Sequence, residues 1–251
     1  MVPELHPQWR TLDFGALLTD GAAFISVDAQ NGILDPAGVL AHEGIWKGAR
    51  EPGGSLHNAL QLASVLRRAS LPFFWLRYDR FIGETQPSTP LDQAQYHFWN
   101  KDYAGDRARK DWECDLISEV KAVLRPEDVT LVYPGWSIFT GTGLARWLTQ
   151  LSVRTLILAG YHTDWCIEMA ARHARELGFV PIVIGDACGT VQPLHDQSLE
   201  QLNNCYAPVL STAVAIGYVE RALALPHDVR GDLGVGHHAI ADIGQGLVDD
   251  G

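Results

Sequence analysis

The sequence has few cysteines, few cations and no long uninterrupted apolar run. Its four cysteines are not arranged with CxxC spacing, so we expect reduced thiols rather than a disulfide framework or a structural zinc site. Lysine and arginine together number 19 against 30 aspartates and glutamates, which gives a formal net charge of -11. This balance argues against non-specific nucleic-acid binding, because phosphate contacts need clustered cations. A small-molecule substrate is the expected partner.

No segment is long and apolar enough to predict a transmembrane helix. The first ten residues, MVPELHPQWR, have neither the basic start nor the apolar stretch of a signal peptide. We therefore expect a cytoplasmic protein with no membrane partner. With 251 residues, 47% hydrophobic content and no low-complexity segment, the chain is long enough to bury one core, which predicts a single domain over residues 1–251.

Short apolar runs alternate along the chain with segments that have apolar residues at helical spacing. The predicted strands are 22–28, 72–78, 129–134, 154–160, 180–186 and 207–212. The predicted helices are 56–69, 116–124, 143–151, 166–177 and 198–206. Alternation of this kind predicts an α/β fold in three layers, with a mainly parallel six-stranded sheet and helices on both faces. In such folds, ligands bind beyond the carboxyl ends of the strands.

Three segments fall outside this alternation. Residues 1–20 form an N-terminal extension, residues 81–110 are rich in aromatic and basic side chains, and residues 227–251 form a C-terminal tail. We interpret the second segment as a lid or a subunit interface, because it is too long for a simple connection. The apolar and aromatic content of the insertion and the tail predicts a homo-oligomer, either a dimer or a tetramer.

One cysteine stands where a strand-like run meets a helix-like run, in LILAGYHTDWCIEMAARHARELGF (156–179). Gly160 ends the strand, Thr163 and Asp164 are candidate N-cap side chains, and Cys166 falls in the first helical turn. A helix N-terminus stabilises a thiolate, so this position predicts a nucleophile that is more acidic than a free thiol. The alternative is a buried cysteine that packs as a small apolar side chain.

Three motifs resemble those of the isochorismatase-like cysteine hydrolases: FISVDAQNGILDP, WSIFTGTGLARWL and LILAGYHTDWCIEMAARHARELGFVPIVIGDACG. Their order and spacing fit from about Ala22 to about Leu223. The resemblance implies a catalytic group of Asp, Lys and Cys, of which the Asp falls on Asp28 and the Cys on Cys166. It also implies hydrolysis of an amide or carbamoyl C–N bond through a thioester, without a cofactor.

The family's lysine does not carry over, because its position holds Tyr133. A phenol is neutral near pH 7 and donates one hydrogen bond, whereas an ammonium brings a positive charge and three donors. Three explanations are open. Tyr133 acts as a neutral donor between Asp28 and the substrate; a lysine from the insertion, Lys101 above all, supplies the charge; or hydrolysis is lost and the protein binds a small molecule or a partner protein.

In the mechanism that the resemblance implies, Asp28 accepts the proton of Cys166 and the thiolate attacks a carbonyl. The backbone amides of His162 and Cys166 are the candidate oxyanion-hole donors. The family also has a cis peptide at this turn, which here corresponds to the Tyr161–His162 bond. Isochorismatase activity itself is disfavoured, because it uses the lysine and does not need the cysteine.

Further side chains border the expected site. Trp136, Tyr161 and Trp165 could form walls for a flat substrate. Arg77, near the end of the second strand, is expected either to hold a substrate carboxylate or to form a salt bridge.

Two expectations concern what the site does not use. Gln30 and Asn31 are expected to bond to backbone rather than to substrate. The metal-dependent relatives have histidines in the loop after the second strand, whereas YDRFIGETQPSTP (78–90) has none, so we expect no catalytic metal.

Overall fold

The computed structural model describes residues 1–79, 90–91, 94 and 106–225. Lys101, the tail 227–251 and most of the 81–110 insertion lie outside the described residues, so the expectations for them stay predictions. The described residues form one six-stranded parallel sheet in the order β3-β2-β1-β4-β5-β6. The strands are β1 (Ala22–Val27), β2 (Phe73–Tyr78), β3 (Val129–Tyr133), β4 (Thr155–Tyr161), β5 (Val180–Gly189) and β6 (Val209–Leu210).

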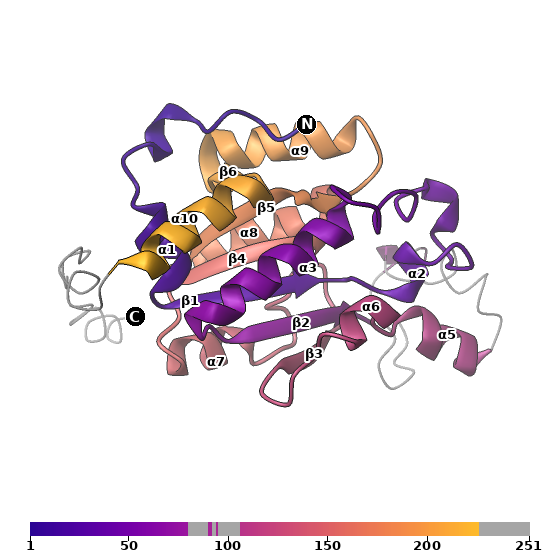
Figure 1. Ribbon diagram of the computed structural model, residues 1–251. Coiled ribbons are helices and arrows are strands. Elements are labelled where there is room, and N and C mark those ends of the chain that lie inside the picture. Colours follow the sequence, from indigo (N-terminus) through magenta and orange to yellow (C-terminus); the bar gives the residue numbers. More distant parts are fainter. Residues whose placement is uncertain (80–89, 92–93, 95–105, 226–251) are drawn as a thin grey trace, which may run out of the picture.

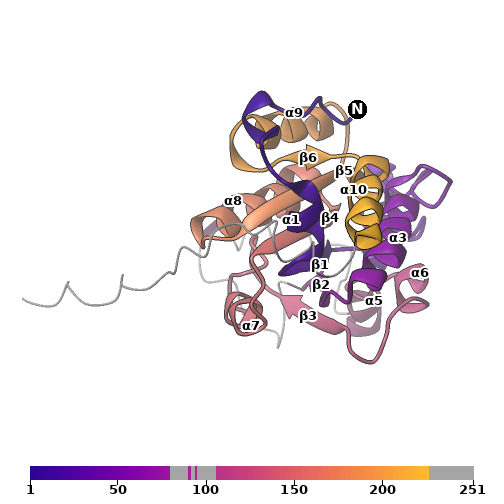
Figure 2. The ribbon, with the colours of Figure 1, turned by 60° about the vertical axis from the view of Figure 1, so that its left-hand side comes forward.

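Helices cover both faces of this sheet, as Figures 1 and 2 show. One face carries α1 (Phe14–Thr19), α3 (Ser55–Leu66) and α10 (Thr212–Ala224), and the other carries α7 (Leu144–Gln150), α8 (Glu168–Glu176) and α9 (Leu194–Gln201). Near the carboxyl ends of the strands lie α2 (Asn31–Leu34), η2 (Ala41–Glu43) and α5 (Arg107–Glu113). The remaining short elements are η1 (Pro7–Trp9), η3 (Arg67–Ala69), α6 (Ser118–Lys121), η5 (Thr163–Ile167) and η6 (Leu202–Tyr206).

The two-residue period of the strands divides the core into two layers. In β1, Phe24 packs on the α3 and α10 side, whereas Ile25 packs on the α7 and α8 side. All six residues of β1 are buried, as expected for a strand covered on both faces. The expected three-layer α/β fold is therefore confirmed.

The largest departure from the predicted elements is α10, a helix that was not among them. Its N-cap is Ser211, whose hydroxyl accepts a hydrogen bond from the Val214 amide at 3.3 Å. Ala215 and Val219, one helical turn apart, are buried on the side of α10 that faces the core. The predicted helix 116–124 is also mostly irregular, since α6 spans only four of its residues.

The N-terminal extension packs along the domain rather than away from it. The Trp9 indole donates to the Asn203 carbonyl at 2.6 Å, and the Asn203 side chain donates to the Glu4 carbonyl at 2.7 Å. Phe14 of α1 meets Tyr218 of α10 with ring centroids 5.3 Å apart. These contacts make the extension part of the same core.

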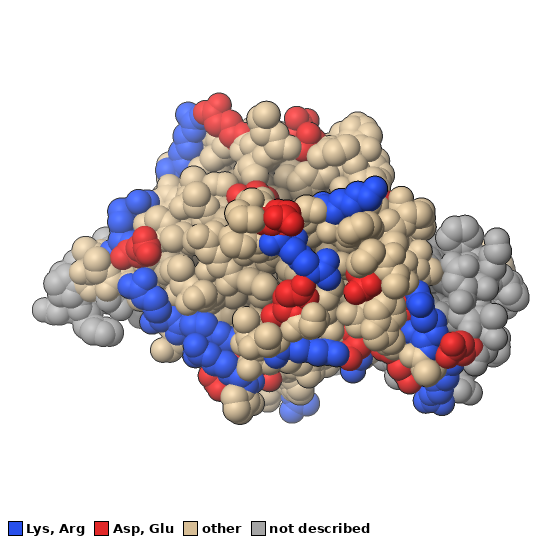
Figure 3. All heavy atoms as spheres, turned by 45° about the vertical axis from the view of Figure 1, so that its right-hand side comes forward, with Lys and Arg blue, Asp and Glu red and all other residues tan. Residues whose placement is uncertain are grey.

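The described part of the chain contains no helix long and apolar enough to cross a membrane. On the face drawn in Figure 3, acidic and basic side chains are interspersed.

Candidate active site

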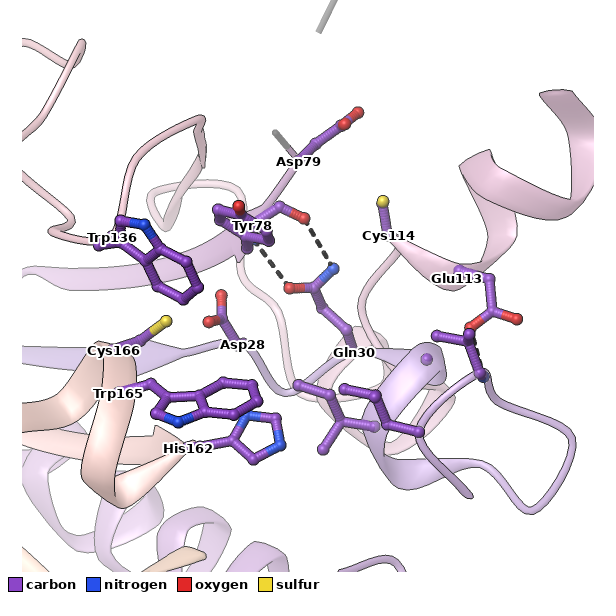
Figure 4. A pocket seen from close by; sticks show the side chains of 14 residues that line it. Asp28, Gln30, Tyr78, Asp79, Glu113, Cys114, Trp136, His162, Trp165 and Cys166 are labelled. Carbon is purple, nitrogen blue, oxygen red and sulfur yellow. Dashed lines mark hydrogen bonds between the residues drawn. The ribbon is translucent and has the colours of Figure 1, made fainter. Parts of the chain in front are cut away.

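Three strands bring the candidate catalytic side chains to one edge of the sheet. Asp28 follows β1, Tyr133 ends β3, and Cys166 lies in η5 just beyond β4. All three are buried, with exposed fractions of 2%, 0% and 5%. Asp28 has a positive φ of 56°, an uncommon backbone conformation that turns the chain away from the strand direction. In Figure 4 the Cys166 sulfur points toward the Asp28 carboxylate.

The Tyr133 hydroxyl donates a hydrogen bond to Asp28 Oδ2 at 2.6 Å. This confirms the expected contact between the phenol and the carboxylate. Burial and the nearby Asp28 carboxylate raise the pKa of Tyr133 well above its ordinary value, so the phenol remains a neutral donor. Tyr133 thus provides Asp28 with a hydrogen-bond donor that carries no charge.

The other oxygen of Asp28, Oδ1, is buried and has no hydrogen-bond partner among the described residues. Burial raises the pKa of Asp28 from 3.8 to about 7, and the Tyr133 hydroxyl, the Cys166 thiol and the His162 ring oppose that rise. A carboxyl group with this pKa is half ionised near neutral pH and can both accept and donate a proton there.

The expectation that Cys166 is more acidic than a free thiol is wrong. Burial and the Asp28 carboxylate raise its pKa well above the ordinary value, although the Tyr133 hydroxyl and the His162 backbone amide oppose the rise. The expected N-cap is also wrong, because the N-cap residue of η5 is His162 and it makes no side-chain cap hydrogen bond. The Thr163 hydroxyl instead pairs with His195 Nδ1 at 2.8 Å.

The turn between β4 and η5 contains the expected cis peptide bond between Tyr161 and His162. The amides of Trp165 and Ile167 donate to the His162 carbonyl at 3.2 and 3.1 Å. The amide of His162 itself faces the Cys166 sulfur, where it favours the thiolate. The proposed oxyanion-hole role of the His162 and Cys166 amides stays a prediction.

A pocket opens in front of this cluster, and aromatic side chains form much of its wall (Figure 4). Trp136 and Trp165 both line it, in an edge-to-face arrangement with centroids 6.2 Å apart. The rings of Tyr78 and Trp136 stack with centroids 6.3 Å apart, and the apolar side chains of Ile33 and Leu40 also line the pocket. The pocket therefore suits a small, flat molecule that presents a polar group to Asp28 and Cys166.

Two acidic residues of the wall are paired with cations. Asp79 lies 3.1 Å from Lys110, and the buried Glu113 accepts from Arg109 Nε at 2.5 Å. Glu113 also accepts from the Val39 amide at 2.9 Å. These pairs fix the wall near α5.

Two expected substrate contacts fall elsewhere in the structure. Tyr161 does not line the pocket, because the strand alternation directs it, with Ile157 and Ala159, to the α3 side, where its hydroxyl bonds to Ser55 at 2.8 Å. Arg77 is likewise absent from the pocket wall and lies 3.9 Å from Asp115, which is the salt-bridge alternative.

Gln30 bonds to backbone as expected. Its amide donates to the Tyr78 carbonyl at 3.1 Å, and its carbonyl accepts from the Tyr78 amide at 2.8 Å. Asn31 similarly donates to the Trp112 carbonyl at 2.9 Å. Within the described ranges, no group of three or more His, Cys, Asp or Glu side chains is arranged to hold a metal ion.

Sequence reasoning missed the His162 side chain, Glu43, Tyr78 and Cys114 as parts of the site. Glu43 and Cys114 lie in short or irregular segments without a periodic pattern, so no local signal identifies them. Tyr78 could have been found, because it ends a predicted strand at the ligand-binding edge.

Residues 22–214 match the family model of the isochorismatase domain, so the chain belongs to the isochorismatase family of hydrolases. Nicotinamidase 3 of Arabidopsis thaliana is 28% identical over 149 residues, which cover 59% of this chain and 70% of the relative. Ureidoacrylate amidohydrolase RutB of Enterobacter sp. (strain 638) is 26% identical over 190 residues, which cover 72% and 81% of the two chains.

Solved structures of two hydrolases have the same fold as this chain. A cysteine hydrolase from Pseudomonas syringae pv. phaseolicola 1448A superposes with a TM-score of 0.67 at 22% identity, covering 88% of this chain and all of that one. N-carbamoylsarcosine amidase from Thermoplasma acidophilum gives a TM-score of 0.57 at 22% identity, covering 76% and 96%.

Proposed function

We propose that this protein is a cysteine-dependent hydrolase that cleaves a C–N bond of a small amide, imide or ureido compound. The observation that carries the proposal is the buried cluster of Cys166, Asp28 and Tyr133, of which the first two line an aromatic pocket. The relatives named nicotinamidase, ureidoacrylate amidohydrolase and N-carbamoylsarcosine amidase support the same reaction class.

In the first half of the reaction, Asp28 takes the thiol proton as the Cys166 sulfur bonds to the substrate carbonyl carbon. The carbonyl oxygen becomes an oxyanion next to the amides of His162 and Cys166. The C–N bond then breaks, and Asp28 returns the proton to the leaving nitrogen. This leaves a thioester on Cys166 and an ionised Asp28.

Proton transfer to Asp28 coincides with attack of the sulfur on the carbonyl carbon, because the resting thiol is not acidic. A pKa of about 7 suits Asp28 to both of its tasks, since it can hold the proton briefly and release it. Tyr133 stabilises the ionised carboxylate with one hydrogen bond before the thiol proton arrives.

The alternative is a family member that binds a small molecule without hydrolysing it. The uncharged Tyr133 and the raised pKa of Cys166 are the observations that favour it. Release of ammonia or amine from a panel of small amides and ureido compounds distinguishes the two. We expect turnover by the wild type and none by Cys166→Ala. The circular dichroism spectrum of the variant should match that of the wild type, which would show that its fold is intact. Binding without turnover by the wild type would favour the alternative.

A further inference from the structure

His162 and Glu43 form a pair at the pocket wall that the first half of the reaction does not use. His162 Nε2 lies 2.8 Å from Glu43 Oε2. The His162 side chain is 4% exposed and lines the pocket, and its ring packs on the Trp165 indole with centroids 4.4 Å apart. A carboxylate and an indole thus fix the orientation of the ring.

The contact with Glu43 assigns the ring's nitrogens. An ionised carboxylate only accepts hydrogen bonds, so Nε2 carries the proton that faces Glu43. In the neutral imidazole, Nδ1 is then an acceptor. The contact with Glu43 is the one hydrogen bond recorded for this ring among the described residues. A base oriented by a second group is an arrangement that activates nucleophiles in many hydrolases.

The other carboxylates of the wall are occupied, since Asp79 pairs with Lys110 and Glu113 pairs with Arg109. The titratable groups that line the pocket beside His162 are Asp28, Tyr78, Asp79, Glu113, Cys114 and Cys166. Glu43 and Tyr133 lie behind them, bonded to His162 and to Asp28. His162 and Asp28 both line the pocket, so the two groups face the same space.

We propose that His162 is the general base of the second half of the reaction and that Glu43 is its positioning residue. His162 Nδ1 takes a proton from water as the water oxygen bonds to the thioester carbonyl carbon. The C–S bond then breaks, the imidazolium gives its proton to the Cys166 sulfur, and the carboxylic acid leaves. Asp28 serves the thiol and the leaving nitrogen, whereas His162 on the pocket wall meets the water that replaces that nitrogen.

This inference rests on the proposed function, and His162→Gln tests it, because the variant keeps the backbone amide and removes the base. With a substrate that the wild type hydrolyses, we expect steady-state kcat to fall about a hundredfold while the first turnover stays within about threefold. Intact-protein mass in the steady state should then show an acyl adduct on Cys166 that reaches a much higher fraction in the variant than in the wild type.

Glu43→Gln should lower kcat about tenfold and change the pH profile of kcat, because the amide keeps a contact but not the charge. Glu51→Gln removes an exposed carboxylate and is the matched control, with kcat unchanged. An active wild type whose His162→Gln variant accumulates no adduct, or loses the first turnover in step with kcat, overturns this inference alone. A wild type with neither turnover nor an adduct overturns the proposed function as well.

Discussion

At the scale of single residues, Tyr133 influences how protons are held in the site. An ammonium beside Asp28 would favour both the carboxylate and the thiolate. The phenol donates one hydrogen bond and leaves Asp28 with a pKa of about 7 and Cys166 with a pKa well above the ordinary thiol value. These protonation properties of Asp28 and Cys166 lead to two predictions, one for the Tyr133 hydroxyl and one for the Asp28 carboxylate.

The first concerns the phenolic oxygen. Tyr133→Phe keeps the packing of the ring and deletes the donor, so kcat/KM should fall by about tenfold to a thousandfold. The rising limb of kcat/KM with pH, expected at about pH 7 in the wild type, should move to higher pH, because the hydrogen bond lowers the pKa of Asp28.

Tyr161→Phe is the matched control, because Tyr161 is also buried and hydrogen-bonded, but its hydroxyl bonds to Ser55 and not to Asp28. It should lose stability and keep its kcat/KM and pH profile. Equal kinetics for wild type and Tyr133→Phe would mean that the phenol has no role in the reaction.

The second residue-scale prediction concerns the stability cost of Asp28. Its pKa is higher in the folded protein than in the unfolded chain, so ionisation destabilises the fold progressively as pH rises from about 4 to about 7. Asp28→Asn should therefore abolish turnover and gain stability relative to the wild type. From pH 5 to pH 8 that gain should increase by about 2–3 kcal/mol.

Urea unfolding of both proteins at the two pH values measures this gain. A difference in unfolding free energy that is the same at pH 5 and pH 8 would contradict the raised pKa of Asp28.

At the scale of elements, the site depends on how closely β4 approaches β1. Gly160 stands opposite Val27 in the register of these strands and has a φ of +131°. A side chain there would collide with the Val27 backbone just before Asp28. Gly160 thus permits both the strand pairing and the turn that positions Cys166.

Gly160→Ala should destabilise the protein by about 3 kcal/mol or more, or prevent folding, because it adds a backbone collision to an unfavourable φ. Gly178→Ala is the control, since Gly178 also has a positive φ of 85° but has open space around it. It should cost about 1 kcal/mol. Similar urea midpoints for the two variants would show that the close approach of β4 to β1 does not make Gly160 more important for stability than Gly178.

The elements also show what the sequence could reveal. The buried strands and the positions of Asp28, Tyr133 and Cys166 at their ends were predictable, because apolar runs and turn residues are local signals. The catalytic roles expected for Asp28 and Tyr133 came from the resemblance to the family's motifs. The orientation of Tyr161 depends on the register of β4, because a shift of one residue along a strand moves each side chain to the opposite face of the sheet. The sequence alone does not fix that register. The acidity of Cys166 was mispredicted because burial and a neighbouring carboxylate from β1 outweigh the local turn, and both depend on tertiary packing.

At the scale of the whole molecule, the expected homo-oligomer stays a prediction. Its basis is the aromatic and apolar content of the insertion and the tail. Light scattering at micromolar concentration should return a multiple of the 27.6 kDa chain mass, as for a dimer or a tetramer. A mass of one chain would reject it.

The most direct test of cysteine-dependent hydrolysis uses the whole protein, in which the thiol, the carboxylate and the pocket are all in place. Wild-type protein is mixed with a library of small amide, imide and ureido compounds, quenched in acid and analysed by intact and peptide mass spectrometry. We predict an acyl adduct on Cys166 with at least one compound and no adduct on Cys166→Ala. Turnover of a compound by Cys166→Ala at the wild-type rate would contradict cysteine-dependent hydrolysis.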